Sequence, residues 1–182
     1  LLAAGSIVVI DEAYIEFSTH ESLVQLASAT PRLIVLRTFS KWGGLAGLRI
    51  GYGVMHPETA QICMQAKQPY NIGIAAEVAA LASLEDSDSL DEKAAIIVSE
   101  RDRLAEEFQS LGWISPWQSD ASFLLCRLDG ISGLELRDRL RTEGIFTRYI
   151  AHPRLEDHLR ISIATPEENN EVLRVLNEIG SE

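Results

Sequence analysis

Short apolar runs alternate with helical patterns along the first part of the chain, and this alternation restricts the possible folds most strongly. The runs SIVVI (6–10), RLIVLRT (32–38) and LRIGYGVM (48–55) read as three strands. The first two are rich in β-branched residues, which is typical of strands buried on both faces of a sheet. Helical patterns occupy residues 20–28 and continue from Pro57 to about Gln65. The sequence therefore predicts an α/β fold with a mostly parallel sheet.

The pattern changes after about Ala75, where an alanine-rich helix begins and a long amphipathic helix follows from about Ser89 to Leu111. Gly112 is expected to end that helix. The remaining expected elements are strands at 122–128, 145–150 and 158–164 and helices at 132–144 and 165–180. We therefore expect two domains, a sheet domain over residues 1–85 and an interdomain helix with a small α+β domain over residues 86–182.

The last helix has a clear start signal. Thr165 is the expected N-cap, Pro166 takes the first helical position, and Glu168 completes a capping box. At the other end, the chain opens with LLAAGSIVVIDEAY and lacks an initial Met. We interpret this opening as the tail of a helix followed by a strand, and expect the chain to be the C-terminal part of a longer protein.

Composition excludes several classes of function. The formal net charge of −11 argues against nucleic acid or an anionic membrane as a partner. No run of about 18 apolar residues is present, so no membrane span is expected. The two cysteines, Cys63 and Cys126, lie far apart, which argues against a zinc site and fits a reducing, cytoplasmic setting. The histidines lack metal-ligand spacing, so no metal is expected, and His152 and His158 are expected to face solvent.

Polar side chains follow the predicted strands where each strand ends. Asp11 follows the first strand, Ser40 and Lys41 follow the second, and Arg49 comes after a glycine-rich turn. In open α/β sheets, ligands bind beyond the carboxyl ends of the strands. These residues are therefore the first candidates for a functional site.

Lys41 carries the chemistry of this candidate site. A lysine after a strand is usually a solvated surface charge. Here Phe39, Trp42 and several glycines surround it, and a desolvated lysine has a lowered pKa and becomes a nucleophilic amine. Thr38, Ser40 and Arg49 add hydroxyls and a guanidinium, which suit a phosphate. A phosphate-bearing aldehyde that forms an imine with the lysine would use all of these groups, and pyridoxal 5′-phosphate is that molecule.

Asp11 and Tyr14 fit the same cofactor. A carboxylate beside the pyridine nitrogen keeps that nitrogen protonated, so that the ring accepts electrons. The tyrosine hydroxyl, three residues further on, is placed to donate to the ring oxygen. The alternative for Asp11 is a residue that shapes the loop at the end of the strand.

Several motifs, taken in order, make the chain resemble the histidinol-phosphate aminotransferase family. The motifs are DEAYIEF (11–17), TFSKWGGLAGLRIGYG (38–53), QPYNIG (68–73) and LRISIAT (159–165). The resemblance spans essentially the whole chain. It implies a fold-type I enzyme that depends on pyridoxal phosphate, with this chain as the C-terminal part of the large sheet domain followed by the small domain.

The resemblance also implies roles for single residues. Lys41 is the lysine that binds the cofactor covalently and moves the substrate proton. The cofactor ligands are Asp11 at the ring nitrogen, Tyr14 at the ring oxygen, and Thr38, Ser40 and Arg49 at the phosphate. Arg160 is expected to hold the substrate α-carboxylate, and Arg148 to face the phosphate of an amino-acid phosphate substrate, with a sheet-edge salt bridge as the alternative for Arg148.

The implied reaction transfers the amino group of L-histidinol phosphate to 2-oxoglutarate in a homodimeric enzyme. Family members also carry an N-terminal arm and the first half of the large domain, which supply further cofactor contacts, so we expect this chain alone to bind the cofactor poorly. Three other interpretations stay open: a threonine-phosphate decarboxylase, an aromatic aminotransferase, or a remnant without catalytic function. IVVIDEA (7–13) also matches a Walker B strand of ATPases, although no upstream P-loop accompanies it.

Overall fold

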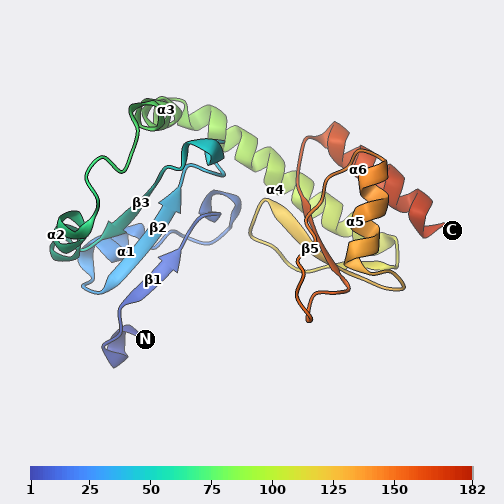
Figure 1. The fold of residues 1–182 in the computed structure, drawn as a ribbon, viewed down its shortest axis with the longest axis horizontal. Helices are drawn as coiled ribbons and strands as arrows, with labels where there is room; N and C mark the ends of the chain where they lie inside the picture. Colours follow the sequence, from blue (N-terminus) through green and yellow to red (C-terminus); the bar gives the residue numbers. More distant parts are fainter. Residues whose placement is uncertain (182) are drawn as a thin grey trace. The chain divides into compact units, whose positions relative to one another are not determined.

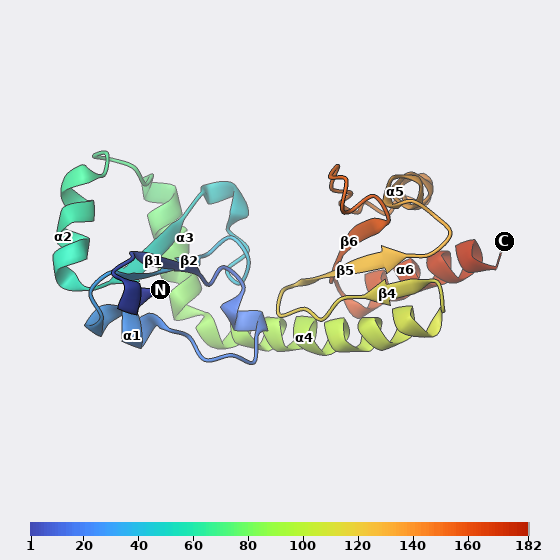
Figure 2. The ribbon, with the colours of Figure 1, turned by 90° about the horizontal axis from the view of Figure 1, so that it is seen from below.

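The computed structural model describes residues 1–181, and the chain divides into two compact units, Leu1–Ala94 and Ala95–Glu182. Figures 1 and 2 present the fold from two directions. The division falls inside the long helix α4 (Ser87–Ser110). The expected boundary between residues 85 and 86 therefore stays a prediction.

The first unit contains a three-stranded sheet of order β1-β2-β3. Strand β1 (Val8–Asp11) runs parallel to β2 (Leu33–Thr38), whereas β3 (Gly51–Met55) runs antiparallel to β2. Figure 1 shows the arrows of β1 and β2 pointing the same way. The other elements of this unit are η1 (Leu2–Ala4), η2 (Ile15–Phe17), α1 (Val24–Ala29), η3 (Ala46–Leu48), α2 (Pro57–Ala66), α3 (Ile74–Glu85) and the start of α4.

Two expectations for this sheet are wrong. The sheet is not mostly parallel, because the chain between β2 and β3 is a loop rather than a crossover helix, and such a loop returns antiparallel. The first strand is not buried on both faces: Val8 and Ile10 pack against the cluster formed by α1 and β2, but Val9 points the other way and is 53% exposed.

The second unit contains the remainder of α4 and an antiparallel sheet of order β4-β5-β6. Its elements are β4 (Ile114–Pro116), β5 (Phe123–Leu128), α5 (Gly133–Thr142), β6 (His158–Ser162) and α6 (Pro166–Gly180). Alternate residues of the strands join side chains of the helices in one core, among them Leu104, Phe108, Leu124, Leu136, Leu159, Ile161 and Leu176. Helix α6 begins with the expected capping box at Thr165 and Glu168.

The expected strand at residues 145–150 is also wrong. Only Arg148 pairs with β6, through an isolated bridge to Arg160. Ile145 and Tyr149 pack against the hydrophobic core instead. Packing against the core therefore determines the path of residues 145–150, rather than pairing along the edge of the sheet. The short strand β4, which ends at a proline, carried too weak a pattern to be expected. No helix among residues 1–181 is both long enough and apolar enough to span a bilayer.

His158 differs from expectation because it is buried. The ring of Trp117 stacks on it with centroids 6.3 Å apart, and the indole Nε1–H donates to His158 Nε2 at 3.1 Å. The other ring nitrogen, Nδ1, lies 2.6 Å from Asp157 Oδ1. Because Nε2 accepts a hydrogen bond, Nδ1 carries the proton in this arrangement. The imidazole is therefore packed against Trp117 at the start of β6 rather than facing solvent.

Candidate active site

The carboxyl ends of β1 and β2 bring the predicted site residues of the first unit to one edge of the sheet. Asp11 is the last residue of β1 and pairs with Leu36, and Thr38 is the last residue of β2. The two strands are parallel, so both ends lie at the same edge. The fold therefore brings Asp11 and Thr38 together at this edge, and their assignment to a site stays a prediction.

Lys41 lies in a tight turn just beyond β2. Gly44, at φ +66°, donates its N–H to the carbonyl of Lys41 at 3.1 Å, and Leu45 N–H donates to the carbonyl of Phe39 at 3.0 Å. The ammonium lies 5.3 Å from the centroid of the Tyr14 ring, within the range of a cation–π contact. The turn thus faces the Lys41 amine toward the loop that follows β1.

The environment of Lys41 differs from the expected one in a single respect: the side chain is exposed. Phe39 and Trp42 turn away from it and pack with Ile50 and the start of α3 in a small apolar cluster. Trp42 also donates its indole N–H to Asp91 Oδ1 at 2.7 Å. The flanking aromatic residues therefore anchor the turn but do not desolvate the amine within this chain.

Asp11 and Tyr14 belong to the loop after β1. Asp11 Oδ1 accepts the N–H of Ala13 at 3.0 Å, which is the loop-shaping contact considered as the alternative role. Asp11 is exposed, and its carboxylate has further acceptor capacity beyond that bond. Tyr14 is half-buried beside Phe17, with ring centroids 6.4 Å apart. The bond from Ala13 therefore shapes the loop and leaves the other acceptor positions of the Asp11 carboxylate available to a ligand.

Thr38, Ser40 and Arg49 gather at the mouth of the loop between β2 and β3. The Thr38 hydroxyl donates to the carbonyl of Ile50 at 3.3 Å and accepts the N–H of Ser40 at 3.0 Å. In β3, a Cβ on Gly51 would lie 2.7 Å from the carbonyl of Arg37, so glycine is required for close approach of the two strands. Contacts between the end of β2 and the start of β3 thus close the loop.

Arg49 adopts a left-handed backbone conformation, with φ +55° and ψ +45°. This region is costly for a residue with a side chain, and such outliers cluster at functional sites. One guanidinium nitrogen, Nη1, donates to the carbonyl of Ala46 at 2.7 Å. The guanidinium has five N–H groups, so it keeps donors for an anion, and together with the Ser40 hydroxyl it forms a donor set that fits a phosphate group.

Arg148 and Arg160 form a pair in the second unit. Each backbone N–H donates to the carbonyl of the other residue at 3.0 Å. Directly opposed residues of an antiparallel pair project their side chains from the same face. The two side chains therefore begin at adjacent positions on the same face of the bridge between Arg148 and β6.

Arg160 has a buried polar atom without a partner. Its Nε is shielded from solvent and makes no hydrogen bond within the described part of the chain. The guanidinium carbon lies 4.8 Å from the centroid of the Phe123 ring, within the range of a cation–π contact. A buried donor without a partner is costly, and an anionic ligand is one partner that would satisfy it.

Some residues of structural importance were missed from the sequence. Glu12 is 6% exposed, and its carboxylate accepts the Ser22 hydroxyl and the Leu23 N–H, each at 2.7 Å. Arg37 Nη2 donates to Glu16 Oε1 at 2.6 Å. Burial opposes the charge of Arg37, but the hydrogen bond and charge of Glu16 outweigh it and raise the pKa of Arg37. The available signal was an arginine inside an otherwise apolar strand.

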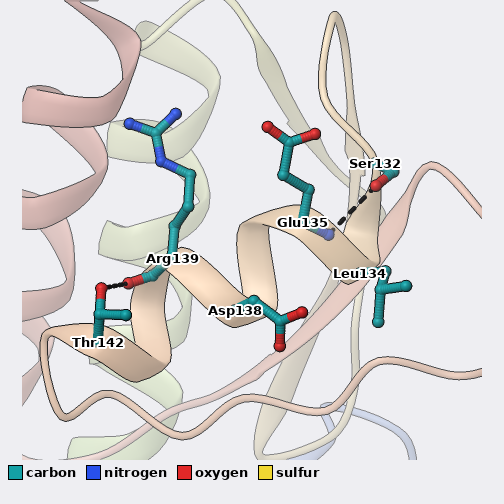
Figure 3. A pocket seen from close by; sticks show the side chains of 6 residues that line it. All are labelled: Ser132, Leu134, Glu135, Asp138, Arg139 and Thr142. Atoms are coloured by element: carbon teal, nitrogen blue, oxygen red, sulfur yellow. Dashed lines mark hydrogen bonds between the residues drawn. The ribbon is translucent and has the colours of Figure 1, made fainter.

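A hollow of about 510 Å³ on helix α5 is an alternative place for a ligand (Figure 3). Ser132 caps the helix by accepting the N–H of Glu135 at 3.1 Å, and the Thr142 hydroxyl donates to the carbonyl of Arg139 at 2.7 Å. These polar groups serve the helix itself, and no predicted site residue lines the hollow. Within residues 1–181, no group of three or more His, Cys, Asp or Glu side chains could hold a metal ion.

Comparison with known proteins identifies the chain's relatives. The family model "Aminotransferase class I and II" matches residues 1–176. The histidinol-phosphate aminotransferase of Roseiflexus castenholzii is 47% identical over 182 residues, covering 98% of this chain and 49% of the relative. The crystal structure of the Clostridium acetobutylicum histidinol-phosphate aminotransferase superposes with a TM-score of 0.87 at 32% identity, over 98% of this chain and 55% of that one.

A further structure is that of the Sinorhizobium meliloti histidinol-phosphate aminotransferase in complex with pyridoxal-5'-phosphate. It superposes with a TM-score of 0.84 at 31% identity and covers 96% of this chain and 49% of that one. The chain thus spans about half the length of the relatives it matches. The Walker B interpretation of residues 7–13 is wrong, since the family model covers that strand. With the strand-end lysine, its loop and nearly the whole chain matched, the chain belongs to the class I and II aminotransferase family.

Proposed function

We propose that the whole protein is a pyridoxal-phosphate-dependent aminotransferase acting in histidine biosynthesis. It transfers the amino group of L-histidinol phosphate to 2-oxoglutarate and gives imidazole acetol phosphate and L-glutamate. The observation that carries the proposal is the Lys41 amine, 5.3 Å from the Tyr14 ring at the sheet edge where Asp11 ends β1. The names of the relatives support the choice of substrates, and we infer that the matched half is the C-terminal one.

The residues of the first unit are assigned to the cofactor by their chemistry. Pyridoxal 5′-phosphate, when bound, supplies an electron-withdrawing ring that stabilises negative charge on the substrate α-carbon. The Asp11 carboxylate would hold a proton on the ring nitrogen, and the Tyr14 hydroxyl would donate to the ring oxygen. Ser40 and Arg49, supported by Thr38, would bind the phosphate.

Lys41 has two tasks in this proposal. Its amine would hold the cofactor covalently through the aldehyde carbon, a bond that forms with loss of water. Once a substrate amine had displaced it, the free amine would take the proton from the substrate α-carbon and deliver it to the carbon that came from the aldehyde. Both tasks need a flexible, nucleophilic amine rather than a fixed cation, which lysine supplies and arginine does not.

The chemical groups of the two substrates suggest a separate role for each of Arg148 and Arg160 in the second unit. L-Histidinol phosphate carries a phosphoester and no carboxylate, so the α-carboxylate expected at Arg160 is that of glutamate or 2-oxoglutarate. Arg148 starts from the same face of the strand and is assigned to the phosphate of histidinol phosphate. Planar guanidinium groups bind carboxylate and phosphate through two parallel hydrogen bonds.

The proposal is tested by reducing the cofactor-loaded whole protein with borohydride and locating the added mass by peptide mass spectrometry. We expect the modification on Lys41. Modification of another lysine, or of none, would contradict the proposal, and failure to bind the cofactor at all would favour a remnant without catalytic function. Release of carbon dioxide from threonine phosphate, in place of keto-product formation, would identify the decarboxylase alternative.

A substitution at Arg148 tests whether this residue recognises the phosphate of the substrate. Arg148→Ala is expected to lower kcat/KM for histidinol phosphate about tenfold or more, the loss expected for a charge-assisted hydrogen bond. Turnover of unphosphorylated histidinol should change much less. Arg154→Ala, which removes an exposed arginine from the same connecting segment, is the matched control. Equal losses for both substrates would count against the assignment.

The proposal also covers the assembly and the compartment of the whole protein. We infer a homodimer, because active sites of the resembled family lie at a subunit interface. Both cysteines are free, with Cys63 exposed and Cys126 buried, which is compatible with the proposed reducing, cytoplasmic setting.

A further inference from the structure

The loop that carries Asp11 and Tyr14 has few backbone bonds to the strand that leads to Lys41. Asp11 is the last residue of β1 in register with β2, and the N–H of Glu12 donates to the carbonyl of Leu36 at 2.9 Å. Beyond Glu12 the loop leaves the ladder. Side chains must therefore fix Tyr14 relative to β2.

One side chain on β2 reaches this loop. Arg37 directly follows Leu36, and its guanidinium contacts both glutamates that flank Tyr14. Nη2 donates to Glu16 Oε1 at 2.6 Å, and Nη1 lies 3.7 Å from Glu12 Oε2. The guanidinium thus holds the loop on both sides of Tyr14.

The contacts are largely shielded from solvent. The side chains of Arg37 and Glu16 are each 16% exposed and that of Glu12 is 5% exposed. Glu12 is tied further to Ser22 and Leu23, and Arg37 Nη1 lies 3.4 Å from the Ser22 hydroxyl. Charges in such an environment interact more strongly than on the surface, and loss of one partner leaves another buried and unpaired.

The arginine is suited to this task by its shape. A planar guanidinium has donors on several edges and serves two carboxylates at once, whereas a lysine ammonium is a single point charge. Since Arg37 also forms part of β2, its position is fixed by the ladder to β3, where it pairs with Tyr52. The strand that leads to Lys41 therefore also positions the loop that carries Tyr14.

We propose that Arg37 is a positioning residue, which clamps Glu12 and Glu16 and thereby fixes the Tyr14 hydroxyl, and with it the cofactor ring oxygen, relative to Lys41. The inference rests on the proposed function. It assigns to Arg37 no contact with substrate or cofactor, and its effect passes through Tyr14.

The first test needs no cofactor. Amide hydrogen exchange in the whole apoprotein should become about tenfold faster or more over residues 11–17 in Arg37→Ala, and Arg37→Lys should restore protection only in part. Arg174→Ala is the matched control, because Arg174 also pairs with two glutamates, Glu171 and Glu178, but on an exposed helix surface. Exchange over residues 11–17 that is equal in the two alanine variants would overturn the clamp.

The second test links the clamp to the cofactor. We expect Arg37→Ala to move the pH midpoint of the bound cofactor's absorption in the same direction as Tyr14→Phe does. In a Tyr14→Phe background the additional change should be small, because the two residues act through one contact. Fully additive shifts, or no shift in Arg37→Ala, would overturn the inference.

A second variant and a measurement that needs no cofactor distinguish failure of the clamp from failure of the proposed function. If Arg37→Ala fails to fold, Glu16→Gln keeps the side-chain shape and removes the charge partner, and the same exchange and absorption changes are expected. If the unmodified protein binds no cofactor, the proposed function fails, whereas the exchange experiment still decides whether Arg37 fixes the loop.

Discussion

Lys41→Ala in the whole protein is expected to lower turnover about 10⁴-fold or more, because the variant would lose both roles proposed for the Lys41 amine, the covalent attachment of the cofactor and the movement of the α-proton. Asp11, Tyr14, Ser40 and Arg49 remain, so non-covalent binding of the cofactor should persist. Steady-state rates and a cofactor titration measure the two effects separately. Unchanged thermal unfolding is expected, since the Lys41 side chain is exposed.

The control for this variant is Lys93→Ala, which removes an exposed lysine from the start of α4. It should leave turnover and borohydride labelling unchanged. An added primary amine should restore part of the rate to Lys41→Ala, because a free amine can carry the same proton. A near-normal rate without added amine would show that the proton is moved by another group.

Arg160→Lys is expected to lower kcat/KM for glutamate about a hundredfold, since the ammonium keeps a positive charge near Phe123 but cannot form the parallel pair of hydrogen bonds proposed for Arg160 and the carboxylate. Cofactor affinity should not change, because the assigned cofactor ligands lie in the first unit. Half-reactions with glutamate and with histidinol phosphate, followed by stopped-flow absorption, measure the effect on each substrate.

Arg127→Lys provides the comparison for this substitution. Arg127 lies on the neighbouring strand β5, opposite His158, and is exposed. It should behave like the unmodified protein with both substrates. A loss of cofactor affinity in Arg160→Lys equal to its loss of glutamate turnover would argue that Arg160 supports the fold rather than binding a carboxylate.

Several features of the fold followed directly from local patterns. The end of β1 at Asp11 and the start of α6 at Thr165 depend on neighbours within a few residues, and the sequence displays these neighbours. The grouping of Asp11 with the turn at Lys41 also followed, because parallel strands end at a common edge. Short-range chemistry and one topological rule were sufficient for this part of the site.

Other features depend on contacts that no local pattern encodes. His158 is buried because Trp117, distant in sequence, stacks on it. The exposure of Lys41 depends on where Phe39 and Trp42 pack, and the left-handed backbone of Arg49 depends on closure of the loop by β3. The pairing of Arg37 with Glu16 joins a strand to a loop 21 residues away. Each of these is a tertiary effect that overrides residue preference.

The loop between β2 and β3 has a consequence for how such proteins diverge. The amine of Lys41 and the guanidinium of Arg49, which is proposed to bind the phosphate, share one hairpin, whose mouth is closed by the bond from Phe39 N–H to the carbonyl of Ile50 at 3.2 Å. Their spacing is thus set within about twenty residues of chain and is independent of Arg148 and Arg160. Mutations that alter substrate preference can therefore accumulate around those two arginines while the chemistry at the hairpin is inherited intact.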